Sequence, residues 1–446
     1  MDLRAFIRDL EGAGELTRIR KPVDPRYITP LTAQCDKGVY FEKIVGYDMP
    51  VVSGLLGSMD RLAVGMQMDK KAIGKRVAQA VQHPVPPVVR DDGPCQEILL
   101  TGDDVDLTRL PLPLHSDLDG APYISAGMTI AKDGEYGRNA GFYRFMYNDP
   151  RHLGIGLLGP SDLRIFYQRA LAAERPVPMA IAIGTHPSDM VAVTYKAPIG
   201  CDELAIAGGL WGKPLELVRC RTIDAEAPAN AEIVLECEIL PVGFSVDEGR
   251  FGEFTRFVGG HVMMPLVEVK AITHRKNPIF QAIHMPMDNI ILDAPVYEAI
   301  AWNILEMAGI ETTAINVSTG GCGQFHVVAA IKKRPGEGKN ALMALLSTAS
   351  FKYAVVVDDD IDVYEPDMVE WAIFSRVQPD RDVIIISDAR AKPLDPSLQP
   401  AKPPAVLPLT AKMGIDATIP EYANKERYTK IVYPFMKDVR LQDYLG

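Results

Sequence analysis

The stretch Asn139-Ala140-Gly141-Phe142-Tyr143-Arg144 brings an amide, two aromatic side chains and a guanidinium together in one strand-like segment. Successive side chains of a strand point to opposite faces, so Asn139 and Arg144, five residues apart, face opposite ways in a regular strand. Gly141 allows a bend or bulge that would bring both to one side. Two interpretations are open: a distorted strand with a functional arginine, or a strand whose Arg144 is half of a surface ion pair.

A second segment, Asp247-Glu248-Gly249-Arg250-Phe251-Gly252-Glu253-Phe254, holds two glutamates separated by glycines and an aromatic residue. Glycine lets the backbone turn sharply or approach a ligand closely. A carboxyl group beside apolar and aromatic groups keeps its proton toward neutral pH, which suits a general acid. The alternative is an acidic turn after a strand.

Arg144, Glu248 and Glu253 together suggest more than each segment does alone. An arginine between two glutamates keeps one ionised and leaves the other free to exchange a proton. This combination is typical of a decarboxylase or lyase site. The spacing in sequence leaves open whether the three residues meet in space.

Composition and charge limit the other possibilities. Apolar residues make up 47% and charged residues 24%, which is typical of a folded globular protein. The net charge of −11 makes nucleic acid an unexpected partner and gives an acidic substrate no long-range attraction, so such a substrate must meet locally placed arginines. At 446 residues we expect three domains, at about 1–98, 99–305 and 306–446.

The compartment is expected to be the cytoplasm. The first ten residues read as an amphipathic helix rather than a signal peptide, and no apolar run is long enough to span a membrane. The six cysteines are scattered without a CxxC pair, which argues against a disulfide framework or a cysteine zinc site and fits a reducing environment.

The pattern of apolar residues changes twice along the chain. The first part mixes strand-like stretches with helices, including one at about 71–82 that the proline-rich stretch 83–87 ends. The middle part has short apolar runs that predict an antiparallel sheet or barrel, namely 179–184, 190–195, 231–240 and 264–272. Helices are expected at 161–174 and 296–308.

The last part alternates strands and helices, which predicts an α/β domain. Strands are expected at 313–317, 326–331 and 353–357, and helices at 338–347 and 366–376. The tail after Pro396 is rich in proline and then charged, and it is expected to end in a short helix at 433–445 that packs on a neighbouring subunit.

Four motifs, in order over about residues 100–385, resemble those of the UbiD decarboxylase family. They are Asn139 to Arg144, then Pro198-Ile199-Gly200-Cys201-Asp202-Glu203 leading into Ala207-Gly208-Gly209-Leu210, then Glu248 to Glu253, and lastly Val357 to Val363 followed by Arg376 to Arg381. The amino-terminal helix is similar too.

The resemblance implies a central split β-barrel that holds prenylated FMN, between an N-terminal α/β domain and a C-terminal α/β domain with a helical tail. It also implies Mn²⁺ and often K⁺ beside the cofactor phosphate. By position, Asn139 and Glu203 match metal ligands, and Phe142, Tyr143 and Arg144 match flavin contacts. Lys352 lies where the family often has a lysine near the phosphate.

The same resemblance assigns Arg144, Glu248 and Glu253 to the catalytic network, with Glu253 as proton donor. It implies reversible, non-oxidative decarboxylation of an aromatic, heteroaromatic or α,β-unsaturated carboxylic acid. Losing CO₂ from an sp² carbon needs an electron sink, which the cofactor supplies. The implied partners are a flavin prenyltransferase, the small acid, CO₂ and further copies of the chain in a homodimer or larger homo-oligomer.

Some residues depart from the family pattern. The stretch 156–162 has no histidine or cation, so Ser161 or backbone amides at the start of the next helix would have to hold the phosphate. Arg250 replaces a usual proline and Arg256 a common glycine; they contact a polar group of the substrate or are solvated. His284 is a further candidate for the substrate pocket.

Three alternatives remain beside these predictions. The chain could be a split-barrel FMN reductase, although no G-x-G-x-x-G loop follows a strand. It could also be a non-catalytic subunit of a multi-component carboxylase. Finally, Asp358-Asp359-Asp360 reads either as a metal cluster or as acids that pair with arginines at the end of a buried strand.

Overall fold

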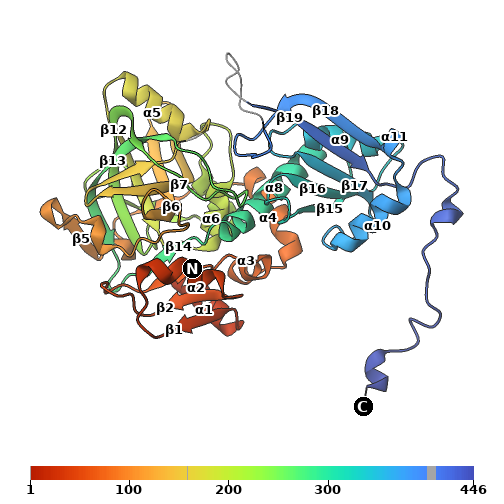
Figure 1. The fold of residues 1–446 in the computed structure, drawn as a ribbon, viewed down its shortest axis with the longest axis horizontal. Helices are drawn as coiled ribbons and strands as arrows, with labels where there is room; N and C mark the ends of the chain where they lie inside the picture. Colours follow the sequence, from red (N-terminus) through yellow and green to blue (C-terminus); the bar gives the residue numbers. More distant parts are fainter. Residues whose placement is uncertain (1, 158, 399–407, 446) are drawn as a thin grey trace.

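The structure is a computed structural model that describes residues 2–157, 159–398 and 408–445. Figure 1 shows three packed parts: a small N-terminal unit, a barrel, and a C-terminal sheet covered by helices. The long helix α8 (Met287–Met307) runs between them. The predicted mixed architecture with a central antiparallel barrel is confirmed, while the domain boundaries near 98 and 305 stay a proposal.

The N-terminal unit is a four-stranded sheet with helices packed against it. Its strand order is β1-β2-β3-β14, and the last strand comes from far along the chain. The strands are β1 (Leu16–Ile19), β2 (Gly38–Phe41), β3 (Val51–Ser53) and β14 (Phe280–Ala282), and the α-helices are α1 (Leu3–Gly12), α2 (Ile28–Ala33), α3 (Met59–Met66) and α4 (Ile73–Gln82). Because β14 pairs with β3, the residues after β14 are tied to this unit.

The barrel closes through six antiparallel strands. The sheet order is β12-β9-β6-β7-β8-β13, and β12 pairs in turn with β13, while β5 (Ile98–Thr101) continues the sheet beyond β13. The six strands are β6 (Tyr123–Asp133), β7 (Gly137–Asp149), β8 (His152–Ile155), β9 (Val177–Ile183), β12 (Ile233–Asp247) and β13 (Met263–His274). Closure pairs each of the six barrel strands on both sides and packs the alternate apolar side chains into one core.

The distortion expected in β7 lies in its partner strand. Ile124 pairs with Phe145 and Gly127 pairs with Tyr143, so two residues of β6 stand opposite the single residue Arg144. This is the two-against-one count of a β-bulge, which re-aims the side chain beside it. Gly141 itself pairs regularly with Thr129.

Residues 190–195 were expected to form a strand, and this prediction is wrong. They lie largely in the helix α6 (Pro187–Thr194), which begins with a proline and is capped by the His186 side chain. The helix is buried on every side, so it lacks the amphipathic pattern that identifies a helix in sequence. Its neighbour, α7 (Glu203–Trp211), is also apolar and buried.

The predicted start agrees with the observed start for one helix and differs from it for another. The helix predicted at 161–174 is confirmed as α5 (Asp162–Ala172), with Ser161 as its N-cap. The helix expected from 296 is α8, and it starts nine residues earlier, at Met287. Pro295 lies inside α8, and a proline in sequence usually marks a helix boundary, which explains the difference.

The C-terminal sheet has strand order β15-β16-β17-β19-β18. Its predicted strands and helices are confirmed, and β18 and β19 add to them: β15 (Thr312–Val317), β16 (His326–Ile331), β17 (Tyr353–Asp358), β18 (Val383–Arg390), β19 (Leu409–Asp416), α9 (Glu337–Leu346), α10 (Pro366–Arg376) and α11 (Pro379–Asp382). Arg376 pairs with Asp358 and Asp360, so the acidic run serves an ion-pair network.

The helix expected at 433–445 is also wrong. Apart from one 3-10 turn at Leu441–Tyr444, the described tail beyond Lys430 is irregular and runs away from the body in Figure 1. A short helix is marginal without a surface to pack on, and Pro434 further weakens it. Within the parts of the chain that the structure describes, no helix is long and apolar enough to cross a bilayer.

Candidate active site

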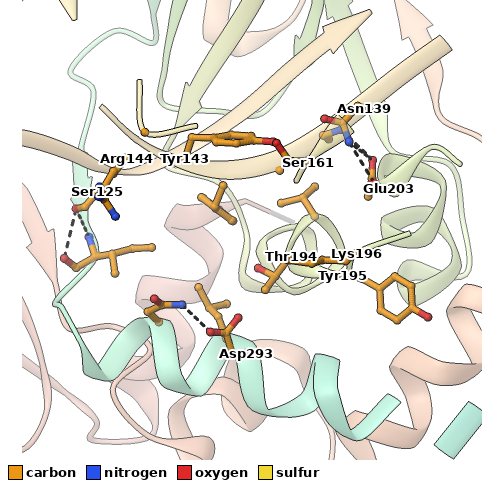
Figure 2. A pocket seen from close by; sticks show the side chains of 18 of the residues that line it. Ser125, Asn139, Tyr143, Arg144, Ser161, Thr194, Tyr195, Lys196, Glu203 and Asp293 are labelled. Carbon is orange, nitrogen blue, oxygen red and sulfur yellow. Dashed lines mark hydrogen bonds between the residues drawn. The ribbon is translucent and has the colours of Figure 1, made fainter. Parts of the chain in front are cut away.

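A cavity of about 450 Å³ opens between the barrel and α8. Its volume lies in the range that holds a cofactor or small ligand. Figure 2 shows Arg144 and Ser125 toward one end, and Asn139 and Glu203 toward the other. The lining residues come from β6, β7, the segment that leads from β8 into α5, α6 and the loop after it, α7, the loop after β12, the segment between β14 and α8, and α8 itself. They are Ser125, 139–144, Gly156, 160–162, 193–197, Glu203, Phe251, Glu253, Ile283, Met285, Asn289, Leu292 and Asp293.

Arg144 joins the two glutamates at one end of this cavity. Its Nη2 donates to Glu248 Oε2 at 2.7 Å and its Nε donates to Glu248 Oε1, which makes the contact bidentate. Its Nη1 donates to Glu253 Oε1 at 2.8 Å. The three residues that the sequence left apart therefore meet, and the surface ion-pair interpretation of Arg144 is wrong.

The network is largely buried. Glu248 is 0% exposed and Glu253 is 7% exposed. The ring of Phe251 lies 4.7 Å from the Arg144 guanidinium and adds a cation–π contact. Burial raises the pKa of Glu253; the Arg144 cation opposes this rise and the neighbouring Glu248 carboxylate adds to it.

The segment that carries both acids is a folded-back loop between β12 and β13. The Glu248 amide donates to Val262 O at 3.0 Å, and the Glu253 amide donates to Phe257 O at 2.9 Å. Gly249 has a φ of +72°, a backbone conformation that favours glycine. The expected role of the glycines in turning this segment is thus confirmed at Gly249.

Asn139 and Glu203 meet at the opposite end. Asn139 Nδ2 lies 3.4 Å from both carboxylate oxygens of Glu203, and the Ala140 amide donates to Glu203 Oε2 at 2.9 Å. Burial raises the pKa of Glu203 to about 8. Among the described residues no basic side chain pairs with this buried carboxyl, and together with the neighbouring amide it is a donor set that suits a hard cation.

Tyr143 and Ser161 lie between these two ends. Figure 2 places the Tyr143 hydroxyl beside Ser161, whose side chain also caps α5 by accepting from the Arg164 amide at 3.3 Å. Burial raises the pKa of Tyr143 to about 12. The N-terminus of α5 therefore faces the cavity, with its free amides as possible anion contacts. Leu158, within the departing stretch 156–162, lies outside the described residues.

Three predicted site residues do not line the cavity. The Lys352 ammonium is held by Asp395 at 2.7 Å and by Ser397 at 2.6 Å. The Arg250 side chain is exposed, with one long contact of 3.4 Å to Gly259 O. His284 is flanked by two lining residues, but its own backbone amide donates to Asp288 Oδ2, and burial lowers its pKa.

Sequence reasoning missed Lys196 and Asp293, which both line the cavity. Asp293 Oδ2 accepts from Asn289 at 2.9 Å and from Gln324 at 2.6 Å, and burial raises its pKa to about 6. An aspartate inside the apolar run of α8 is a signal that could have been used, because charged residues are rarely buried without a reason. Lys196 lies two residues after the buried helix α6 and is exposed, so the same signal does not mark it.

Family profiles of 3-octaprenyl-4-hydroxybenzoate carboxy-lyase domains match nearly the whole chain. The N-terminal domain matches residues 7–81, the Rift-related domain 87–287 and the C-terminal domain 291–417. The chain belongs to the UbiD family. The UbiD resemblance drawn from four motifs is therefore confirmed, and the enzyme is a decarboxylase of this family.

Individual relatives agree with this assignment. Anhydromevalonate phosphate decarboxylase from Methanothermobacter thermautotrophicus is 33% identical over 395 residues, covering 86% of this chain and 88% of the relative. The UbiD-class enzyme HmfF from Pelotomaculum thermopropionicum, solved with FMN, is 38% identical with a TM-score of 0.92 over the full length of both chains. An evolved dimeric form of HmfF, solved with prFMN, is 37% identical with a TM-score of 0.88, again over both full chains.

A third relative acts on an aromatic acid. The apo 3,4-dihydroxybenzoic acid decarboxylase AroY from Klebsiella pneumoniae is 29% identical with a TM-score of 0.89, and the match covers 99% of this chain and 98% of AroY. The UbiD-class relatives that match along nearly the full length of this chain thus include decarboxylases and complexes with flavin.

Proposed function

We propose that this UbiD-family chain catalyses the reversible, non-oxidative decarboxylation of an aromatic, heteroaromatic or α,β-unsaturated carboxylic acid with prenylated FMN. The observation that carries the proposal is the buried Arg144 bridge between Glu248 and Glu253 at the wall of a cofactor-sized cavity. Such a bridge provides a cation that can bind the substrate carboxylate and a carboxylic acid that can protonate the product.

The lining residues fit the proposed cofactor and its ions. Phe142, Tyr143 and Arg144 would contact the flavin, and Ser161 with the start of α5 would meet its phosphate. Lys196 adds a cation that the stretch 156–162 lacks. Asn139 and Glu203 would hold Mn²⁺, with K⁺ nearby, because a buried carboxyl whose pKa is raised to about 8 gains most from a cation.

Arg144 would bind and orient the substrate. A guanidinium has five N–H groups, of which three donate to Glu248 and Glu253. The remaining two can meet the substrate carboxylate without breaking the network. Prenylated FMN, when bound, supplies the electron sink that loss of CO₂ from an sp² carbon requires.

Glu253 would deliver the proton that replaces CO₂. It must be protonated to do so, and burial raises its pKa in that direction. Glu248 would hold the guanidinium in place through its bidentate contact and, as a like charge, favour the protonated form of Glu253.

The test is to produce the chain with and without a flavin prenyltransferase. Bound cofactor is identified by mass spectrometry, and CO₂ release is measured from furan, pyrrole, indole, phenolic and cinnamic acids. We expect a prenylated flavin and CO₂ release in the co-produced protein only. NAD(P)H consumption with plain FMN, or no flavin bound at all, would instead support the reductase or the non-catalytic subunit.

A further inference from the structure

A second loop lies directly against the acids, and neither the motifs nor the family assignment points to it. It precedes β6 and contains Gly120. Asp119 forms a parallel β-bridge with Arg250, and the Gly120 amide donates to Arg250 O at 3.2 Å. The loop before β6 therefore pairs through its backbone with the loop after β12. The pairing is at Arg250, which lies between Glu248 and Glu253 in sequence.

The lack of a side chain at Gly120 and at Gly249 lets the two loops approach each other closely. A Cβ atom added to Gly120 would lie 2.3 Å from Glu248 O, and one added to Gly249 would lie 2.9 Å from Gly120 Cα. Both contacts are with backbone atoms, which cannot swing aside as a side chain can. The position of the Glu248 backbone is thus set by the absence of a side chain at Gly120.

Tyr123 contacts the same backbone atom through its hydroxyl. Its hydroxyl donates to Glu248 O at 3.2 Å, and its ring lies 4.6 Å from the ring of Phe251. Phe251 in turn lies against the Arg144 guanidinium. Tyr123 is 0% exposed, so both contacts are made inside the protein and cannot be replaced readily by water.

We propose that Gly120 and Tyr123 are positioning residues that hold the Glu248 backbone and thereby align both glutamates on Arg144. The proposal rests on the proposed function, because it gives these residues a role in the same decarboxylation. Neither residue lines the cavity, so each acts through the loop and not on the substrate.

The alignment has a consequence for proton transfer. Glu248 stands close enough to Glu253 to raise its pKa, while Arg144 lowers it. If the Glu248 backbone moves outward, the like charge recedes and the pKa of Glu253 falls. Loosening the loop therefore has a signature in the pH profile that a general loss of stability does not produce.

The experiment compares two isosteric variants of the holoenzyme. Tyr123→Phe removes only the hydroxyl that reaches Glu248 O. Tyr167→Phe is the matched control, since the buried Tyr167 hydroxyl also donates to backbone carbonyls, those of Leu240 and Gly243, away from the acids. Hydrogen exchange of residues 248–262 and the pH profile of kcat are measured for both.

We expect Tyr123→Phe to exchange faster over residues 248–262, to lose about tenfold in kcat and to move the basic limb of its pH profile to lower pH, with KM little changed. Tyr167→Phe should leave the exchange of this segment and the pH limb as in the unsubstituted enzyme. Unchanged exchange in Tyr123→Phe, or faster exchange with an unmoved pH limb, would overturn the proposal.

Gly120→Ala provides a second, independent arm, with Gly260→Ala as its control. An added Cβ at Gly260 meets nothing within 4 Å, although it lies in the same loop as the acids. Gly120→Ala should reproduce the changes of Tyr123→Phe more strongly, and an effect equal to that of Gly260→Ala would contradict the proposal. An unsubstituted holoenzyme without decarboxylase activity would overturn the proposed function instead, while hydrogen exchange still tests the loop contact.

Discussion

Arg144 makes different numbers of hydrogen bonds to Glu248 and Glu253. Glu248 receives two hydrogen bonds from the guanidinium and is 0% exposed, whereas Glu253 receives one and lines the cavity. A carboxyl held by a single bond can turn toward a ligand and exchange a proton more readily than one held by two. The geometry therefore favours Glu253 over Glu248 as the proton donor.

The pH dependence of decarboxylation should report on Glu253. Its pKa is raised by burial and by Glu248, and a general acid works only while protonated, so kcat should fall as pH rises through this pKa. In Glu248→Gln the like charge is gone, and the fall should begin at lower pH. A pH–rate profile of both holoenzymes measures this, and a limb that stays in place would contradict it.

Glu203 should make the metal-free protein less stable as pH rises. Its pKa is raised from an unfolded value near 4.5 to about 8, so the folded state keeps a proton that the unfolded state loses between these values. Stability should fall across this window by about 1.4 kcal/mol per unit of pKa difference at most.

In Glu203→Gln this part of the pH dependence should disappear. Chemical denaturation at pH 5 and pH 8 measures the difference between the two proteins. Added Mn²⁺ should restore stability at pH 8 in the unsubstituted protein but not in the variant. Equal pH dependence of both proteins would contradict the assignment of Glu203.

The predicted site residues that the structure places at the cavity lie in short motifs with unusual neighbouring residues. Arg144, Glu253, Asn139 and Glu203 line the cavity, and Glu248 is joined to it through its contact with Arg144. Lys196 and Asp293 lie outside those motifs, and only the folding of α6 and α8 brings them to the cavity. Lys352 does not line the cavity and pairs with Asp395, which is distant in sequence, so its proposed place near the phosphate stays a prediction.

At the scale of elements, the predictions held best in the C-terminal sheet and its helices. The helix α10 was placed at its observed bounds, and the strands β15, β16 and β17 were found to within one residue, whereas β18 and β19 were not predicted. The helix α6 was mistaken for a strand because burial on all sides removes the helical pattern. The bulge opposite Arg144 lies in β6, where no glycine or proline in sequence marks its two residues.

The glycines of the motif Ala207-Gly208-Gly209-Leu210 have a packing role. A Cβ at Gly208 would lie 2.2 Å from Val85 O, and one at Gly209 would lie 2.9 Å from Ala80 O. The helix α7 can thus pack closely against α4 and the proline-rich stretch after it, and this packing positions the helix whose first residue is Glu203.

Gly208→Ala should therefore destabilise the protein by about 1–3 kcal/mol, because the added methyl group forces α7 away from Val85. It should also weaken Mn²⁺ binding, since Glu203 begins this helix. Thermal unfolding and metal titration measure the two effects. Gly134→Ala, where the added atom meets nothing within 4 Å, is the control, and equal stability of the two variants would contradict the packing role.

For the whole molecule, α8 is the element that joins all three parts. It follows β14 of the N-terminal sheet, lines the cavity with Asn289, Leu292 and Asp293, and buries Tyr297 and Leu305 in the core of the C-terminal unit. In the described part of the tail, in contrast, the last polar contact with the body is that of Lys430 with Asp360.

The tail should dock on another copy of the chain. Its large apolar side chains are at least half exposed: Ile431, Val432, Tyr433, Phe435, Met436, Val439, Leu441, Tyr444 and Leu445. Such a segment is stable in water only when a surface covers it. The helix α10 offers Phe374, 80% exposed, close to the point where the tail departs over Trp371.

Deleting residues 431–446 should lower the oligomeric state, as measured by light scattering at micromolar concentration. The double substitution Lys437→Ala with Asp438→Ala keeps every apolar side chain of the tail and should leave the oligomer intact. A monomeric full-length chain would contradict this prediction. So would a truncated chain that forms an oligomer with the same number of subunits.

The central claim is that Glu253, held by Arg144 beside Glu248, exchanges the proton at the carbon that loses CO₂. The most direct measurement is deuterium incorporation from D₂O at this carbon of the decarboxylated product, by the enzyme and by Glu253→Gln at equal prenylated-flavin content. We predict exchange by the enzyme and a loss of at least about 100-fold in the variant. Exchange at an undiminished rate in Glu253→Gln would contradict the claim.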